Sequence, residues 1–285
     1  MKPLSGVVRQ RFSSEVQKAE EDLNLALAAL LVAQEEYSQL PVDRYLTRLD
    51  LLAEETRDRL DGETAPLLVL HELLDTLYQR HNFRGNREAY YDPRNSFLND
   101  VLDRGLGIPL TLGIVLLEVG WRLGLPLEGV NFPGHFLVRF HGDAVDFLVD
   151  PYDGGALRFQ DQAQELLDRV YGGMIRVHDS FLRTARRHEM VIRLLTNLKS
   201  LYLNVQDHAR ALAAVERILL LRPTGPIEIR DRGVILARMG KRGEALEQLE
   251  AYLHLAPEAA DSQRIRGMVE ELRNGDGRNP SRGDG

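Results

Sequence analysis

The chain has 285 residues, of which 44% are hydrophobic and 28% charged, a composition typical of folded globular proteins rather than of disordered or fibrous ones. The formal net charge is −7, and lysine and arginine are not clustered, which argues against a nucleic-acid-binding protein. The chain contains no cysteine, and this excludes disulfides, thiolate metal sites, iron–sulfur clusters and cysteine nucleophiles.

The sequence predicts a protein that neither enters nor crosses a membrane. The segment from Met1 to Phe12 lacks the apolar core of a secretory signal peptide. The longest apolar run, Leu25 to Ala33, is too short to span a bilayer. Because the lack of disulfides also suits the cytosol, we expect a cytoplasmic protein.

The first part of the chain is predicted to form three packed helices. The first covers 12–34 and the second 42–60, each with apolar residues at helical spacing. The third follows Thr64, which we expect to cap it, and has Pro66 in its first turn.

A buried central helix is predicted after a polar stretch. The segment 81–108 is rich in polar residues and predicts an irregular surface segment with a short helix near 96–102. Pro109 begins a longer helix that reaches about Leu123 and ends at Gly124, with proline at the start and glycine after the end. This helix is apolar on nearly all sides, and such helices lie in a protein core.

The hydrophobic pattern then changes to period 2 and predicts an antiparallel hairpin. The segments HFLVRF and VDFLVD begin at His135 and end at Asp150, and each alternates apolar and polar residues. If Phe140 pairs with Val145, His135 lies directly opposite Asp150 on the same face of the hairpin, close enough for contact. A further helix is expected around 160–171.

From about Met190 the sequence repeats itself with a period of 34 residues. The residues separated by this interval have matching characters: Ala211 and Ala245, Val215 and Leu249, Pro223 and Pro257, Gly233 and Gly267. A period of 34 with a small residue, a bulky residue and a proline in these places is the signature of tetratricopeptide repeats. Each repeat is a helix pair that buries its apolar face only by stacking on a neighbour.

The predicted contact between His135 and Asp150 supplies two members of a nucleophile-activating triad. The third member, a nucleophile, would gain from a helix N-terminus, where the macrodipole stabilises negative charge. Thr111 is the only hydroxyl in the first turn after Pro109 and is therefore the candidate nucleophile. Two interpretations stay open for these three residues: a catalytic or binding site, or a structural pair beside a threonine bonded to the backbone.

Residues on the loops predicted to flank the pair are candidates for lining a ligand cleft. Those with aromatic or amide side chains are Tyr90, Tyr91, Asn95, Asn131 and Phe132. Packing of the segment 81–108 onto the domain explains them equally well. The remaining histidines are scattered and no HExxH motif occurs, so we expect neither a metal nor a cofactor.

The stretch from Tyr90 to Phe140, with its motif GVNFPGHF, and the following LVDPYDGG resemble the bacterial SirB family. Proteins of that family join a transglutaminase-like domain to C-terminal tetratricopeptide repeats. The resemblance covers about residues 12–273 and implies the papain-like fold of transglutaminases.

The resemblance also implies a cysteine at the start of the central helix, followed by a histidine and an aspartate on adjacent strands. His135 matches the family's histidine and Asp150 its aspartate. The place of the cysteine falls at Leu110 or Thr111, and neither is a cysteine. The resemblance therefore supplies a fold but no activity.

We therefore expect an α/β protein, more closely α+β and mostly helical, with a transglutaminase-like domain over 1–180. All-α tetratricopeptide-type repeats should follow over 181–275, and a disordered tail over 276–285. The expected function is a non-catalytic scaffold or regulator that binds a protein or peptide partner through the repeats. One alternative is a hydrolase or acyltransferase in which His135 and Asp150 activate a hydroxyl or water. Another is a binding module whose former active-site cleft captures a peptide or small molecule.

Overall fold

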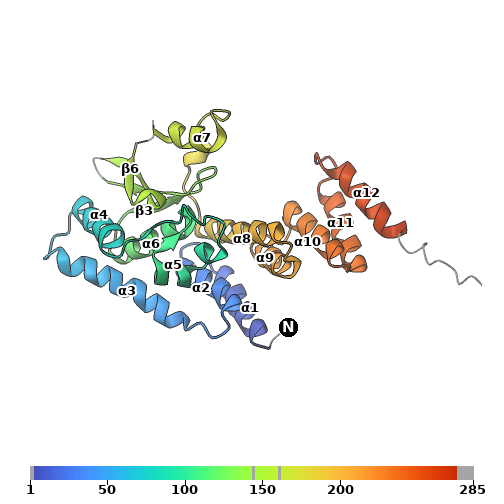
Figure 1. The fold of residues 1–285 in the computed structure, drawn as a ribbon, viewed down its shortest axis with the longest axis horizontal. Helices are drawn as coiled ribbons and strands as arrows, with labels where there is room; N and C mark the ends of the chain where they lie inside the picture. Colours follow the sequence, from blue (N-terminus) through green and yellow to red (C-terminus); the bar gives the residue numbers. More distant parts are fainter. Residues whose placement is uncertain (1–2, 143–144, 160–161, 275–285) are drawn as a thin grey trace, which may run out of the picture. The chain divides into compact units, whose positions relative to one another are not determined.

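The computed structural model describes residues 3–142, 145–159 and 162–274 (Figure 1). The chain divides into two compact units, Met1–Leu194 and Leu195–Gly285. The first unit combines helices with two small sheets, and the regular structure described in the second unit is helical. The tail predicted over 276–285 lies outside the described residues.

Four helices open the first unit: α1 (Pro3–Val16), α2 (Leu25–Glu36), α3 (Val42–Arg59) and α4 (Pro66–Leu74), which continues as a π-helix, η1 (Asp75–Arg80). The single helix expected over 12–34 is wrong, because Asn24 caps a new helix by accepting a hydrogen bond from the Leu27 amide at 2.8 Å. Thr64 does not cap α4 as predicted, since Ala65 occupies the capping position and makes no side-chain hydrogen bond there.

The polar segment contains short elements rather than one surface loop. They are β1 (Arg84–Gly85), the 3-10 helix η2 (Pro93–Ser96), α5 (Leu98–Arg104) and β2 (Leu106–Gly107). Strands β1 and β2 pair in parallel and form the smaller sheet. The short helix predicted near 96–102 corresponds to α5, and its side chains Leu98, Val101 and Leu102 are buried.

The central helix α6 (Pro109–Arg122) confirms the prediction, with every residue from Pro109 to Gly120 buried. Two glycines let it approach the sheet closely. A Cβ added to Gly113 would come within 2.4 Å of the Phe136 ring, and one added to Gly120 within 2.3 Å of Leu127. The helix therefore fixes the position of the strands that follow it.

The larger sheet has the order β3-β4-β5-β6 and is antiparallel throughout: β3 (Leu127–Val130), β4 (Leu137–His141), β5 (Asp146–Asp150) and β6 (Ala156–Arg158). Figure 1 shows the sheet between α6 and α7 (Ala163–Tyr171). Val130, Leu137 and Leu148 form one core cluster with Leu166 and Leu167 of α7.

The hairpin exists, but its predicted register is wrong by two residues. Phe140 pairs with Phe147 rather than with Val145. The reason is the turn, since the Gly142 amide donates to the Val145 carbonyl at 2.9 Å and the ladder thus extends further than expected. A shift of two residues leaves every side chain on its predicted face, because side chains alternate with period 2.

The first unit is completed by the short helices η3 (Pro151–Asp153) and η5 (Asp179–Leu182) and by the start of α8 (Arg187–Asn204), which continues into the second unit. On α8, Met190 contacts the sheet at Gly129, where an added Cβ would lie 3.0 Å from its sulfur. Part of α8 therefore belongs to the core of the first unit.

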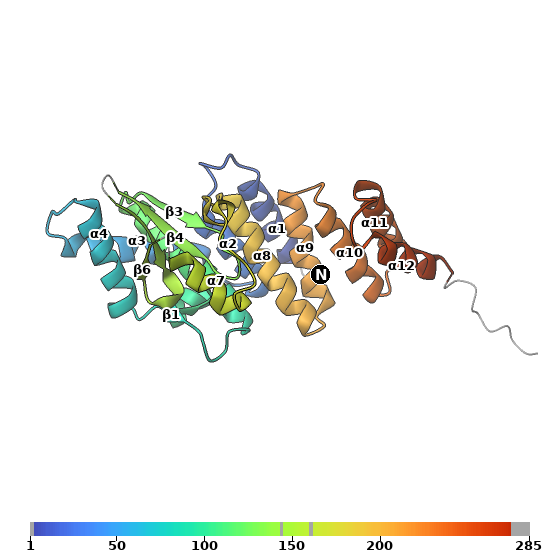
Figure 2. The ribbon, with the colours of Figure 1, turned by 90° about the horizontal axis from the view of Figure 1, so that it is seen from above.

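The second unit contains α9 (His208–Leu221), α10 (Pro226–Arg238), α11 (Arg242–Leu255) and α12 (Ser262–Asn274) (Figures 1 and 2). Each helix packs against the next in the chain. Ala211 and Ala245, equivalent in the 34-residue repeat, are both fully buried on α9 and α11. The paired helices and their period confirm the predicted tetratricopeptide-type architecture.

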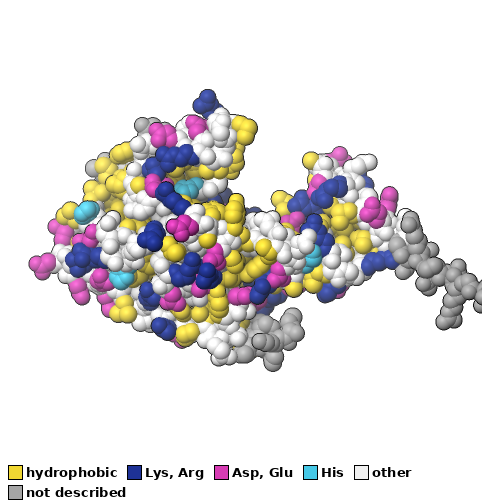
Figure 3. Space-filling model, viewed as in Figure 1, with side chains coloured by type: hydrophobic (Ala, Val, Ile, Leu, Met, Phe, Trp, Pro, Cys, Tyr) yellow, Lys and Arg dark blue, Asp and Glu magenta, His cyan; other side chains and the backbone are white. Residues whose placement is uncertain are grey.

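Two features of the described surface bear on possible surroundings. No helix within the described ranges is both long and apolar enough to pass through a membrane. On the face shown in Figure 3, basic side chains are interspersed with acidic ones.

Candidate functional site

The candidate site is built around a contact between a side chain of the larger sheet and one from a loop beside it. His135 lies in the loop between β3 and β4, and Asp150 is the last residue of β5. The Nε2 atom of His135 lies 2.8 Å from Oδ1 of Asp150, so the contact predicted for this pair is present. The side chain of Asp150 is 2% exposed and that of His135 is 13% exposed. The imidazole therefore reaches solvent while its carboxylate partner does not.

Asp150 is held by a set of donors that favours its ionised form. Its Oδ1 accepts the amides of Tyr152 at 3.1 Å and Asp153 at 3.2 Å, and its Oδ2 accepts Nε of Arg158 at 3.1 Å. Burial alone would raise the pKa of Asp150, but the hydrogen bond and charge of His135 and the charge of Arg158 hold that pKa below its ordinary value.

This environment determines the tautomer of the neutral His135 ring. An ionised carboxylate only accepts hydrogen bonds, so Nε2 must carry the proton that Asp150 accepts. The lone pair of the neutral ring is then on Nδ1. Orientation by a buried carboxylate is the arrangement in which histidine serves as a general base.

His135 and Asp150 border a cavity of about 430 Å³. Pockets for small molecules commonly have this size. Its walls come from β5, the loops on either side of the sheet, α7 and the first residue of α6: Arg87, Tyr90, Pro109, Gly134, His135, Asp150, Tyr152, Asp153, Arg158, Leu166, Arg169 and Val170. The rings of Tyr90 and Tyr152 lie 6.1 Å apart, edge to face, and Tyr152 meets the imidazole of His135 in the same way at 6.0 Å.

The third candidate, Thr111, is not part of the cavity wall. It is 0% exposed. Its hydroxyl donates to the carbonyl of Asn95 at 2.7 Å and accepts the amide of Ile108 at 3.2 Å. Leu110, the other position at which the resemblance places a cysteine, is also buried. Only Pro109 of the first turn of α6 reaches the cavity.

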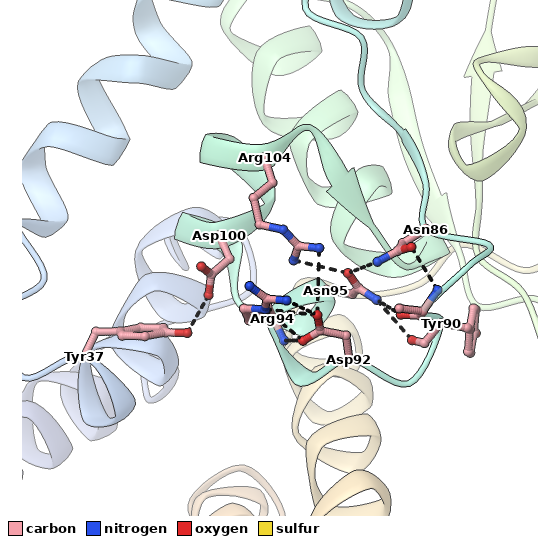
Figure 4. A network of polar contacts seen from close by, with 9 residues as sticks. Tyr37, Asn86, Tyr90, Asp92, Arg94, Asn95, Asp100 and Arg104 are labelled. Atoms are coloured by element: carbon pink, nitrogen blue, oxygen red, sulfur yellow. Dashed lines mark hydrogen bonds and ion pairs between the residues drawn. The ribbon is translucent and has the colours of Figure 1, made fainter.

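A polar network centred on Asn95 supports the wall that Tyr90 forms (Figure 4). The Asn95 amide nitrogen donates to the carbonyls of Ala89 at 2.7 Å and Tyr90 at 3.2 Å. Its oxygen accepts from Asn86 at 3.0 Å and Arg104 at 3.3 Å. All the hydrogen-bonding capacity of this buried amide is therefore used. Asn95 positions Tyr90 from behind the wall.

Of the five residues predicted to line a cleft, Tyr90 is in the wall of this cavity and the other four are not. Tyr91 is 74% exposed and stacks edge to face on Tyr90 at 5.3 Å. Phe132 is fully buried in the core cluster below the sheet, and Asn95 is buried in its network. The Asn131 side chain accepts a hydrogen bond from Arg193 at 3.3 Å. Of the aromatic and amide residues on these loops, Tyr90 is the one that lines the cavity.

Sequence reasoning missed Arg193, which holds the loop that carries His135. From α8 its guanidinium donates to the carbonyls of His135 and Phe132 and to Asn131. Burial lowers the pKa of Arg193, whereas the charge interactions with Tyr90 and Tyr171 act to raise it. The only sequence signal is a cation within an apolar stretch of helix, since its neighbours Met190, Val191, Ile192, Leu194 and Leu195 are all buried.

The cavity arginines Arg87, Arg158 and Arg169 were also missed. Arg158 follows the motif LVDPYDGG, and extending the strand pattern past that turn would have placed it beside Asp150. Arg87 lies in the polar segment and Arg169 on α7, far apart in sequence. No local pattern marks these two residues.

Comparison with known proteins agrees with this architecture. The family model of the transglutaminase-like superfamily matches residues 43–196, and that of the tetratricopeptide repeat matches 198–270. Two UPF0162 proteins from strains of Xylella fastidiosa are 36% identical over 258 residues and 37% identical over 261 residues. Each alignment covers 90% of this chain and 92% of the relative. The chain belongs to the UPF0162 family.

Other UPF0162 proteins are similar over most of the chain. YchA of Escherichia coli strain K12 is 31% identical over 236 residues, which are 80% of this chain and 83% of that protein. Among solved structures, a crystal structure of menin with the binding site for the Mixed Lineage Leukemia protein aligns with 95% of this chain and 75% of its own, at 12% identity and a TM-score of 0.42. A TM-score at that level does not establish a shared fold.

This UPF0162 protein thus combines a transglutaminase-like core with tetratricopeptide repeats and contains no cysteine. The imidazole and carboxylate expected from the resemblance are in contact, and the thiol is absent. The arrangement can orient a histidine toward a cavity, but it cannot form a thioester on a cysteine.

Proposed function

We propose that this UPF0162 protein is a non-catalytic interaction protein, a scaffold or regulator of the SirB type, whose repeats bind a protein or peptide. The observation that carries the proposal concerns the side chains that share the described cavity wall with His135. Among the described residues that line the cavity there is no serine, threonine, cysteine or lysine.

The chemistry of Thr111 supports the same proposal. A threonine hydroxyl is far less acidic than a thiol and needs a base in direct contact to become a nucleophile. The Thr111 proton is donated to the Asn95 carbonyl instead, and its oxygen accepts the Ile108 amide. His135 would have to replace both contacts before it could act on this hydroxyl.

The repeats supply the surface for a partner. Tetratricopeptide-type helix pairs stack on one another, and the stack presents an extended face to other proteins. Here α10 and α11 form the most extensively packed helix pair, with α9 on one side of it in the chain and the final helix α12 on the other. We propose that this region recruits the partner and that the transglutaminase-like domain contributes binding rather than bond cleavage.

The catalytic half of the proposal is tested by glutamine–amine crosslinking and by peptide hydrolysis. Wild type, His135→Gln and Thr111→Val should all show no turnover above buffer. Thr111→Val keeps the shape of the side chain and removes only its hydroxyl. Turnover in wild type that disappears in both variants would overturn the proposal in favour of a threonine mechanism.

The interaction half is tested by affinity capture from native lysate. The full chain is compared with a chain that ends at Asn204, which keeps α8 whole, because the start of this helix belongs to the first unit. Proteins captured by the full chain and lost with the shortened chain would support the repeats as the binding region. An identical set of proteins from both chains would contradict it.

A hydrolase with activated water is a second candidate, favoured by the orientation of His135. With Nε2 bonded to Asp150, the Nδ1 lone pair could accept a proton from water in the cavity. In the hydrolysis assay this mechanism has its own signature, since activity would be lost in His135→Gln and retained in Thr111→Val.

A further inference from the structure

Most of the charged side chains around the cavity form ion pairs with one another. The carboxylate of Asp153 accepts Arg87 at 2.7 Å and Arg158 at 2.7 Å, while Asp150 accepts Arg158 and His135. Two arginines are thus compensated by two carboxylates. These groups leave little net charge of their own at the cavity.

Arg169 differs from the other two cavity arginines. It is exposed on the last turn of α7 and forms part of the cavity wall. Within the described ranges its guanidinium makes no hydrogen bond and no ion pair, in contrast to Arg87 and Arg158. A guanidinium in this state offers its fork of N–H donors to a ligand.

A second cation, Arg193, lies behind the cavity wall, and no carboxylate among the described residues pairs with it. Within the described residues, the Arg193 guanidinium donates hydrogen bonds to neutral oxygens, those of the Phe132 and His135 carbonyls and of the Asn131 side chain. Burial raises the pKa of the Tyr90 phenol. The charge of Arg193 lies close enough to that phenol to oppose part of the increase. Because salt screens buried charges weakly, Arg193 adds to a positive potential in the cavity.

We propose that this cavity binds a carboxylate group, carried either by the free C-terminus of a peptide or by a small carboxylic acid. The carboxylate pairs with Arg169, and the apolar part of the ligand lies against Tyr90 and Tyr152. The inference rests on the proposed function, because it treats the cavity as a binding site in which no bond is broken.

The chemistry of the site favours a carboxylate over other anions. One free guanidinium matches one carboxylate in a planar, two-pronged contact. A phosphate dianion carries a second negative charge, which the single free guanidinium of Arg169 does not balance. The aromatic and aliphatic walls, which include Leu166 and Val170, suit an organic chain attached to the charge.

The test compares matched probes that differ only in charge: N-acetylphenylalanine and its amide, titrated into the full chain. Binding is followed by calorimetry and by the proton resonances of the His135 ring. We expect the acid to bind more tightly than the amide. We expect Arg169→Gln to weaken binding of the acid by about threefold or more, the range of a solvent-exposed ion pair, with little change for the amide.

The control is Arg176→Gln, an exposed arginine after α7 that does not line the cavity. It should bind the acid as wild type does. Equal binding of acid and amide, equal losses in the two arginine variants, absence of any binding, or stronger competition by inorganic phosphate than by benzoate would each overturn the proposal.

Two further probes separate the sources of the carboxylate. N-acetyl-Ala-Ala-Phe carries it at a peptide terminus, and 3-phenylpropionate carries it without a peptide bond. Tighter binding of the tripeptide assigns the site to peptide ends, and tighter binding of the small acid assigns it to metabolites. Hydrolysis of the tripeptide during titration would contradict the proposed non-catalytic function but not the proposal that the cavity binds a carboxylate. Absence of both binding and hydrolysis would overturn only the inference.

Discussion

Asp150 organises more of the local structure than His135 does. Its carboxylate accepts hydrogen bonds from His135, from the amides of Tyr152 and Asp153, and from Arg158. Removing the imidazole leaves three of these donors satisfied, whereas removing the carboxylate charge weakens all four. The two residues therefore contribute unequally to the local structure, because the turn after β5 depends on the Asp150 carboxylate and not on the imidazole.

The lowered pKa of Asp150 predicts a pH dependence of stability. A group whose pKa is lower in the folded state stabilises the fold above its unfolded pKa, about 4, and this contribution is lost as the pH falls through the folded pKa. Asp150→Asn should therefore melt below wild type at neutral pH, and the gap should narrow in acid below about pH 4. Melting curves across this range check it, with exposed Asp179→Asn as control. A gap that stays constant would contradict the assignment.

The saturated hydrogen bonding of Asn95 predicts a large effect from a change of the same shape. Asn95→Asp replaces the amide nitrogen that donates to the Ala89 and Tyr90 carbonyls with an oxygen that cannot donate. We expect the free energy of unfolding to fall by about 2–4 kcal/mol in urea titrations. Asn82→Asp is the matched control, because the exposed Asn82 side chain only accepts from Arg84. Equal effects of the two substitutions would refute the network.

The sequence could place His135 and Asp150 on one face but not in exact register. Side chains alternate between the two faces of a strand, so an error of two residues leaves each side chain on its predicted face. The exact register depends on where the ladder ends, and it ends at the pair His141 and Asp146, one residue further along the first strand than expected. Arg193 was beyond prediction for another reason, because its contacts with the His135 loop join residues about sixty positions apart through the docking of α8.

At the level of elements, two glycines that are equivalent in the sequence repeat have different surroundings. Gly233 on α10 lies against α11, and an added Cβ would come within 2.7 Å of Leu249. Gly267 on α12 has no atom within 4 Å of the corresponding position. The 34-residue period predicts the same surroundings for both glycines. Their surroundings differ because another helix packs on α10 at Gly233 and none packs on α12 at Gly267 within the described residues.

This difference predicts opposite effects of one substitution. Gly233→Ala should overpack the α10–α11 contact and cost about 1–3 kcal/mol of unfolding free energy. Gly267→Ala should be neutral or stabilise by up to about 1 kcal/mol, since alanine restricts the unfolded chain. Thermal melting of both variants is the measurement. Destabilisation by Gly267→Ala as large as that by Gly233→Ala would show that the stacking order is wrong.

Element boundaries show where periodicity stops being informative. The pattern over 12–34 predicted one helix, whereas residues 17–24 lie between α1 and α2, and it did not reveal that Asn24 caps the second of these. Asparagine is a strong capping residue and a poor interior one. The central helix α6 was predictable in both type and extent, because Pro109 and Gly124 mark its ends and nearly every residue between them is apolar.

At the scale of the whole molecule, the packing predicts an uneven stability. Helix α6 contacts helices α2, α3 and α5 as well as strands β3 and β4. Helix α12 packs on α11, at the end of the described repeats. Elements with fewer neighbours open more readily, and end repeats have one neighbour only.

Hydrogen–deuterium exchange read by mass spectrometry would measure this gradient. We expect amides of α6 to exchange most slowly and those of α12 to exchange earliest among the long helices. The exchange of α9, inside the repeat array, should lie between them. Protection in α12 equal to that in α6 would mean that the end of the array is covered by something other than α11.

The position of Arg158 has a consequence for self-association. Strand β6 is the outer strand of the larger sheet, and Leu157 and Phe159 beside Arg158 are exposed. A charged residue on an edge strand, aimed back at its own sheet, is one way in which proteins prevent that edge from pairing with another molecule. Arg158→Val would free one oxygen of Asp150 and leave an uninterrupted apolar edge. We therefore expect the same side chain that steadies the carboxylate to oppose aggregation as well, and Arg158→Val to aggregate more readily than wild type.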